Sequence, residues 1–316
     1  MRQGFTPVLC THTPGGVHED DYVRMLLDRG VAGIIYVSGQ HADTRTDPRR
    51  YVHLRDRGLP IVLANGFMPG VDAPFVSNDD EASIELALNH LIHLGHHRIG
   101  LAVGPQRYVP SQRKIAGFHR FLKDFLGDFL GEDAVGDLVE TEMYTVEGGQ
   151  AAAQRLVEKG CTAIVCGSDL MALGAIRGVR AVGMRVPDDI SVIGYDDSTL
   201  IAFTDPPLTT IRHGVLAMGE CAVQALVDEI AGMPVSRTEY VFRPELVVRG
   251  SGWMRQGSAV ACSRSSRSCS RVSTTSATDP TRYAACVAPL PTLTGTSPCC
   301  ASRVLNASSS VTSSPV

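Results

Sequence analysis

The stretch AIVCGSDLMALGAIRGVRAVGMRVPDDISVIGYDD, residues 163–197, decides the fold. It holds two short apolar runs, residues 163–166 and 191–195, on either side of a helical pattern over residues 169–182. Gly183 follows the helical pattern at the position where a left-handed residue ends a helix. A strand, a crossover helix and a second strand are the repeating unit of a parallel sheet covered by helices.

The same alternation extends outward from this stretch, from about residue 4 to about residue 250. Strands are expected over residues 6–10, 33–37, 60–64, 75–77, 99–103, 138–142, 163–166, 191–195, 209–212 and 239–247. Helices are expected between them, over residues 19–29, 48–57, 81–94, 112–126, 149–159, 169–182 and 215–230. Two sets of about five strands predict an α/β protein with two doubly wound parallel-sheet lobes. Because such lobes bind ligands at the carboxyl ends of their strands, we expect a ligand cleft between them.

The composition is that of an ordinary soluble protein, with 44% hydrophobic and 20% charged residues. No uncharged apolar run reaches the ~18 residues that a membrane span needs, and residues 1–30 show no secretory signal. We therefore expect a cytoplasmic protein with no membrane partner.

Charge and cysteine spacing exclude several kinds of site. Residues 1–252 hold 23 basic and 32 acidic residues, so their net charge of −9 is unsuited to gripping a phosphate backbone. The cysteines form no pair of CxxC motifs, so we expect no zinc or other metal site. We also expect no cofactor. No nucleophile–base pair or phosphate-binding loop is recognisable, so we do not expect an enzyme.

The last part of the chain, residues 252–316, differs in kind from the rest. It is rich in Ser and Thr, contains scattered Pro and Cys, and shows no apolar period. Such a segment cannot bury enough surface to fold, so we predict a low-complexity disordered tail. The abrupt change suggests translation in a shifted reading frame, a hypothesis that sequencing of the locus tests.

Several motifs, in order along residues 4–251, resemble one family. They are RGVAGIIYVSG (residues 29–39), NHLIHLGHHRIGLAVGP (89–105), KIAGFHRFL (114–122), DLMALGAIRGVRAVGMRVPDDISVIGYDDSTLIAFTDPPLTTIRH (169–213) and FRPELVVRGS (242–251). Together they are similar to the LacI/GalR transcriptional regulators, whose periplasmic-binding-protein-like core binds a small effector. The resemblance implies a repressor that responds to an effector and forms a homodimer.

The resemblance also implies the boundaries of the two lobes. The N-terminal lobe is expected over residues 1–103 plus 214–234, and the C-terminal lobe over residues 104–213 plus 235–251. Family members begin with a helix-turn-helix and a hinge helix, followed by a first strand and helix, and this chain resembles them only from about Gly4 onward. We therefore expect an incomplete first lobe, and binding to operator DNA only if the native protein carries the missing head.

Polar residues that follow strands are the candidate ligand contacts of the second lobe. Asp196 ends an apolar strand, where a carboxylate accepts strong hydrogen bonds from hydroxyl groups. The resemblance implies a ligand contact there, although Asp196 can also simply cap the loop. Ser168 stands before a helix and is either a ligand contact, as in the family, or an N-cap.

Other candidates come from a helix start, an aromatic position and the first lobe. The family usually has a ligand-binding Arg where Lys114 stands, so Lys114 or the neighbouring Arg113 is expected to contact the ligand. Tyr144 matches a family aromatic that stacks on the ligand, with core packing as the alternative. In the first lobe, His12, Ser38 and Asn65 follow strands and are expected to reach the cleft.

The effector class and the role of the fold each leave an alternative open. A sugar or sugar phosphate is the first expectation for the effector, and a purine is the second. The same two-lobed fold also serves solute-binding proteins of sugar transporters, which require an export signal. The motifs of residues 169–213 are closer to the regulators.

Overall fold

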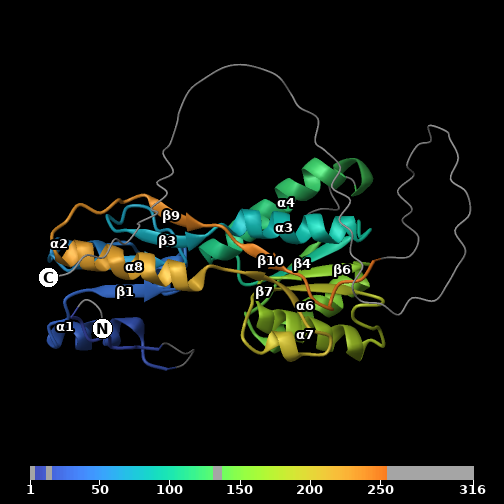
Figure 1. Ribbon diagram of the computed structural model, residues 1–316, viewed down its shortest axis with the longest axis horizontal. Helices are drawn as coiled ribbons and strands as arrows, with labels where there is room; N and C mark the ends of the chain where they lie inside the picture. Colours follow the sequence, from blue (N-terminus) through green and yellow to red (C-terminus); the bar gives the residue numbers. More distant parts are fainter. Residues whose placement is uncertain (1–3, 12–15, 131–136, 255–316) are drawn as a thin grey trace, which may run out of the picture. The chain divides into compact units, whose positions relative to one another are not determined.

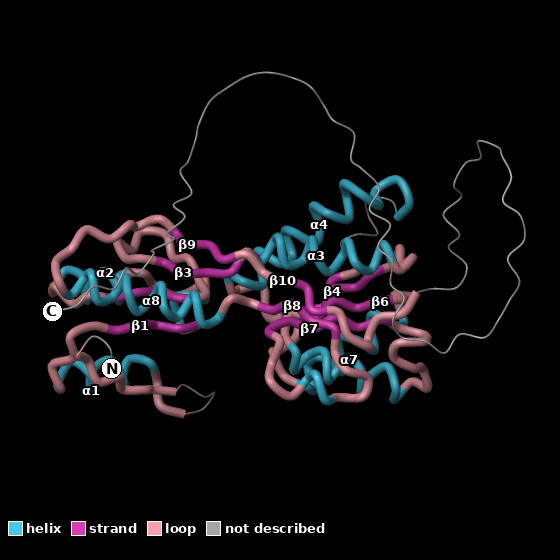
Figure 2. Tube along the Cα trace, in the orientation of Figure 1, coloured by secondary structure: helices cyan, strands magenta, loops and turns pink. Residues whose placement is uncertain are grey.

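The computed structural model describes residues 4–11, 16–130 and 137–254, which form two separate β-sheets with their helices (Figures 1 and 2). The tail that we expect to be disordered lies, from residue 255 onward, outside the described residues. None of the helices in the described ranges is long and apolar enough to cross a membrane.

The first sheet has four strands, all parallel. In spatial order they are β1 (Ile34–Val37), β2 (Ile61–Ala64), β3 (Phe75–Asn78) and β9 (Glu239–Phe242). Alternate residues point to opposite faces, so each face has its own core. One face packs on α1 (Glu19–Asp28) and α2 (Arg49–Asp56), and the other on α8 (Val215–Ile230).

The second sheet has six strands. In spatial order they are β10 (Glu245–Val247), β8 (Thr209–Arg212), β7 (Ser191–Asp196), β6 (Ala163–Cys166), β4 (Ile99–Val103) and β5 (Val139–Thr141). Only β10 runs antiparallel to its neighbour. Figure 1 shows α3 (Asp80–His93) and α4 (Val109–Leu130) over one face and α6 (Val146–Glu158) and α7 (Asp169–Ala181) over the other. A single apolar core that includes Leu101, Phe118 and Ile164 joins these layers. The predicted parallel α/β architecture is confirmed.

The predicted lobe boundaries are wrong in two places. The strand over residues 99–103 belongs to the second sheet, where it pairs with β5 and β6. The single strand expected over residues 239–247 is two strands, and its first half, β9, joins the first sheet beside β3. The chain therefore first passes between sheets after Asn78. Alternation along a sequence predicts that strands exist, but pairing partners are set by contacts between distant residues.

The strand predicted over residues 6–10 is absent from the described part of the chain. A strand needs a hydrogen-bonded neighbour, and β1, the first strand present, lies at one edge of its sheet with β2 on its inner side. The apolar residues Val8 and Leu9 are correspondingly exposed.

Candidate functional site

Strained backbone marks the carboxyl ends of strands in both sheets. Within the described ranges, the non-glycine residues with positive φ are Ser38 (49°), Asn65 (63°), Asp196 (118°) and Asp197 (57°). Ser38 and Asn65 directly follow β1 and β2, and Asp196 is the last residue of β7. Residues other than glycine rarely adopt a positive φ, because this backbone conformation costs free energy. Residues that do adopt it cluster at functional sites. Three of the four are ligand contacts predicted from the sequence.

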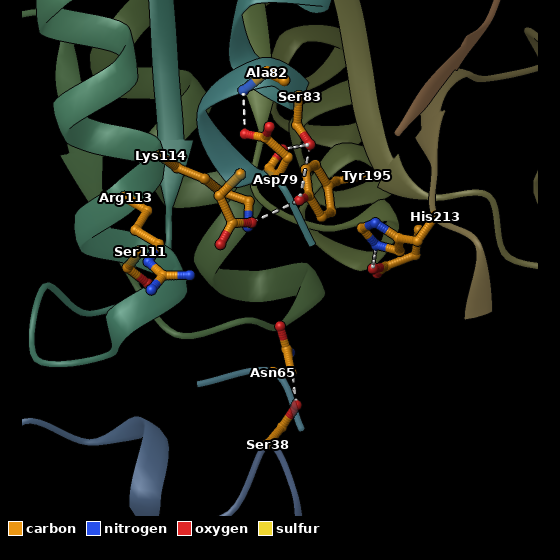
Figure 3. A network of polar contacts seen from close by, with 12 residues as sticks. Ser38, Asn65, Asp79, Ala82, Ser83, Ser111, Arg113, Lys114, Tyr195 and His213 are labelled. Carbon is orange, nitrogen blue, oxygen red and sulfur yellow. Dashed lines mark hydrogen bonds and ion pairs between the residues drawn. The ribbon is translucent and has the colours of Figure 1, made fainter. Parts of the chain in front are cut away.

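In the first sheet, Ser38 and Asn65 are brought together. The side-chain amide of Asn65 donates a hydrogen bond of 2.7 Å to Ser38 Oγ (Figure 3). The Ser38 amide donates to the carbonyl of Ala64 at 3.0 Å, which ties the two strand ends to each other. Another predicted contact, His12, lies outside the described residues.

His41 supports this pair from behind, and sequence reasoning did not single it out. Its side chain is buried, and Nε2 donates to the Ala64 carbonyl, which also receives the Ser38 amide, at 3.0 Å. The rings of Tyr36 and Tyr51 approach it edge-on, and the Glu19 carboxylate lies nearby. Gly66 is required beside it, because a Cβ there would lie 2.8 Å from Ala42 and 3.2 Å from the His41 ring.

Acid is expected to destabilise the protein through His41. Burial lowers the pKa of His41 below its ordinary value of 6.5, although the bond to Ala64 and the charge of Glu19 oppose the shift. Between the two pKa values, His41 is therefore protonated in the unfolded chain but neutral in the folded chain. The stabilisation is complete above the unfolded pKa and is lost as the pH falls toward the folded pKa. Urea unfolding at about pH 7.5 and about pH 5.5 should show a larger drop for the wild type than for His41→Gln. Equal drops would contradict this assignment.

In the second sheet, Asp196 is held by a residue that sequence reasoning missed. His213, which follows β8, donates from Nε2 to Asp196 Oδ1 at 3.0 Å. Its ring packs against Tyr195 with centroids 4.4 Å apart, and its Nδ1 is buried without a hydrogen-bond partner among the described residues. The Asp196 side chain remains 48% exposed, so its carboxylate has room for a further donor. The signal in the sequence was the position of His213, immediately after a strand that adjoins β7.

Asp197, by contrast, is occupied by structural ion pairs. Arg212 and Arg249 each donate to its carboxylate at 2.6 Å. Burial alone would raise the pKa of Asp197, but these two guanidinium groups outweigh burial and lower it.

Lys114 and Arg113, the two cations predicted to meet the ligand, both have carboxylate partners. The Lys114 side chain is 3% exposed, and Nζ lies 2.5 Å from Asp80 Oδ1. Burial alone would lower the pKa of Lys114, but Asp80, through its charge and hydrogen bond, together with Tyr195 and Tyr144, outweighs burial and raises it. Arg113 donates two parallel hydrogen bonds, of 2.8 and 2.9 Å, to Glu239 of the first sheet.

Tyr144 stands close to Lys114, where its ring is half-buried. Its hydroxyl hydrogen-bonds to Ser111 Oγ at 2.8 Å. A Cβ at Gly104 would lie 1.9 Å from the ring, so only glycine leaves room for it. The aromatic face is therefore fixed in place beside the strand ends.

Ser168 acts as the N-cap of α7, with Oγ accepting the Met171 amide at 3.2 Å. The cap alternative is thus confirmed for its hydroxyl, and the side chain is buried. The neighbouring Asp169 accepts from the Ser198 amide and the Thr210 hydroxyl, both at 2.7 Å, and so fixes the loop after β7.

A direct contact joins loops that follow β1 and β4. The Thr44 amide and Oγ1 both donate to the Arg107 carbonyl, at 2.8 and 2.9 Å. Asp43 forms an antiparallel bridge with Tyr108, and its carboxylate lies 3.1 Å from Arg107 Nε. This cluster of Asp43, Thr44, Arg107 and Tyr108 links the two sheets near the strand ends that carry the candidate site.

Thr44→Val is expected to loosen this contact. The variant keeps the side-chain shape but removes one hydrogen bond of about 1 kcal/mol, so exchange of the residue 44 amide hydrogen should accelerate about threefold to tenfold. Hydrogen exchange followed by mass spectrometry measures this exchange rate, and Thr46→Val is the control in the same loop. Exchange of the wild-type amide at the rate of an unstructured peptide would contradict the contact.

Comparisons with known proteins point to one family. Residues 88–252 match the family model of the periplasmic binding protein-like domain. HTH-type transcriptional regulator MalR of Streptomyces coelicolor is 60% identical over 250 residues, 79% of this chain and 72% of that protein. HTH-type transcriptional repressor CytR of Escherichia coli is 34% identical over 250 residues, 77% of this chain and 68% of that protein.

A solved structure described as a transcriptional regulator CelR–cellobiose complex matches with a TM-score of 0.65 and 32% identity. The match covers 74% of this chain and 69% of the CelR chain. These relatives are regulators of transcription and not enzymes. The chain therefore belongs to the LacI family of HTH-type transcriptional regulators, and the part described here is their effector-binding core.

Proposed function

We propose that this core binds a small sugar effector at the strand ends and acts in the cytoplasm as the sensor of a repressor. The observation that carries the proposal is the Asp196 carboxylate, strained at the end of β7, oriented by His213 and still half-exposed. A carboxylate in that state accepts hydrogen bonds from ligand hydroxyls. The cellobiose named with the related CelR supports a sugar.

Other groups give the sugar its remaining contacts. Ser38 and Asn65 supply hydroxyl and amide groups from the first sheet, and Tyr144 supplies an aromatic face from the second. Sugars stack their apolar faces on such rings while their hydroxyls bond to the polar groups around them. Ser168 stays a proposed ligand contact because it lies directly before α7. Its hydroxyl oxygen already accepts the Met171 amide as the helix cap.

A ligand that contacts both sheets favours one arrangement of the lobes over another, since a population shift requires different affinity for the two states. We propose that a homodimer passes this shift to operator DNA through the DNA-reading segment that the family's regulators carry. The contact of Asp43 and Thr44 with Arg107 joins the two lobes, so its stability contributes to the balance between the two arrangements.

Thermal unfolding of the full chain with a ligand panel tests the proposal. The panel contains cellobiose, maltose, glucose, ribose and, for the purine alternative, adenosine. At a concentration of about 100 times Kd, a bound ligand stabilises by about 2.7 kcal/mol, which raises the midpoint by several degrees. We expect at least one sugar to do so and adenosine to have no effect. Stabilisation by adenosine alone would overturn the sugar assignment.

A further inference from the structure

The buried cation of the candidate site already has its counter-charge. Lys114 Nζ lies 2.5 Å from Asp80 Oδ1 and 3.9 Å from the centre of the Tyr195 ring. The Tyr195 hydroxyl donates to the same Asp80 oxygen at 2.7 Å and hydrogen-bonds to Ser83 Oγ at 3.2 Å. Lys114 and Asp80 are each 3% exposed, so the pair is held away from solvent.

The two cations predicted to meet the ligand are both already paired with a carboxylate. Arg113 is matched by the bidentate Glu239, as Lys114 is by Asp80. A site that captures a phosphate group needs uncompensated Lys or Arg side chains or free backbone amides aimed at it. Here an anion would have to displace Asp80 from Lys114.

We propose that Asp80 is a specificity-determining residue that neutralises Lys114 and so restricts the effector to uncharged polyhydroxylated molecules, excluding their phosphate esters. The inference rests on the proposed function, because it concerns the same site. Breaking a buried ion pair leaves an unpaired charge and is costly, so an anionic ligand receives little net attraction from Lys114. A neutral sugar leaves the pair intact and uses the exposed Asp196 carboxylate for its hydroxyls.

Inorganic phosphate is the probe that separates this proposal from the identity of the sugar. We expect phosphate to leave the thermal midpoint of the wild-type chain unchanged and to raise that of Asp80→Asn, measured at mildly acidic pH where the lysine keeps its proton. The double variant Asp80→Asn with Lys114→Gln should lose this response, because it has no unpaired cation. Asp79→Asn is the matched control: Asp79 is adjacent but caps α3 through the Ala82 amide, a role that Asn also fills.

Glucose and glucose 6-phosphate provide a second arm, and its wild-type comparison does not depend on the folding of Asp80→Asn. Wild type should bind glucose more tightly than its phosphate ester, and Asp80→Asn should shift the ratio of affinities toward the ester by about tenfold to a hundredfold. The proposal is overturned if wild type prefers the ester, or if Asp80→Asn responds to phosphate no more than wild type does. If neither sugar binds any variant while phosphate binds Asp80→Asn alone, the charge assignment stands and these sugars are excluded as effectors.

Discussion

Gly174→Ala is expected to lower the free energy of unfolding by about 3 kcal/mol or more. A Cβ at residue 174 of α7 would lie 1.9 Å from the carbonyl oxygen of Val146 and 2.8 Å from the amide nitrogen of Gln150, both on α6. These are backbone atoms, so no side-chain rotation relieves the clash. The two helices would have to separate and would disturb the apolar core beneath them.

Gly219→Ala is the control for this substitution. Gly219 lies within α8, and a Cβ there would meet nothing within 4 Å. The same change should therefore stabilise that helix by about 0.5–1 kcal/mol, because Ala loses less backbone entropy than Gly. Urea unfolding followed by circular dichroism measures both variants. Equal midpoints would mean that α6 and α7 do not approach this closely.

Asp196→Asn is expected to weaken sugar binding by about tenfold to a hundredfold, the scale of a hydrogen bond to a charged acceptor. The substitution keeps the shape of the side chain and removes only its charge. Because Asp196 is half-exposed, the free energy of unfolding should change little.

Isothermal titration with the sugar that stabilises the chain most measures this effect. The matched control is Asp205→Asn, since the Asp205 side chain is 98% exposed on the loop before β8. An unchanged Kd for Asp196→Asn would show that Asp196 does not contact the sugar and would contradict the proposed binding site.

The strand and helix pattern was predictable because these strands are short apolar runs bounded by glycine and polar turns. The runs at residues 163–166 and 209–212 match β6 and β8 at both ends. The assignment of strands to sheets was not predictable. Residues 99–103 and 239–242 exchange places between the lobes relative to the expectation, because pairing depends on partners that are distant in the sequence.

The candidate site was predictable in position but not in electrostatics. Ser38, Asn65 and Asp196 are recognisable as polar residues after strands, and the structure adds their strained backbone. The pairing of Lys114 with Asp80, 34 positions earlier, has no local signal in the sequence. A motif shows which residue type stands at a position, whereas only the fold shows that a carboxylate already neutralises it.

A crystal structure of the chain with its stabilising sugar tests the central claim most directly. We expect a sugar hydroxyl within hydrogen-bond distance of the Asp196 carboxylate, a further contact to Ser38 or Asn65 from the first sheet, and an intact Lys114–Asp80 ion pair. A sugar bound elsewhere, or one that contacts Lys114 with Asp80 displaced, would contradict it.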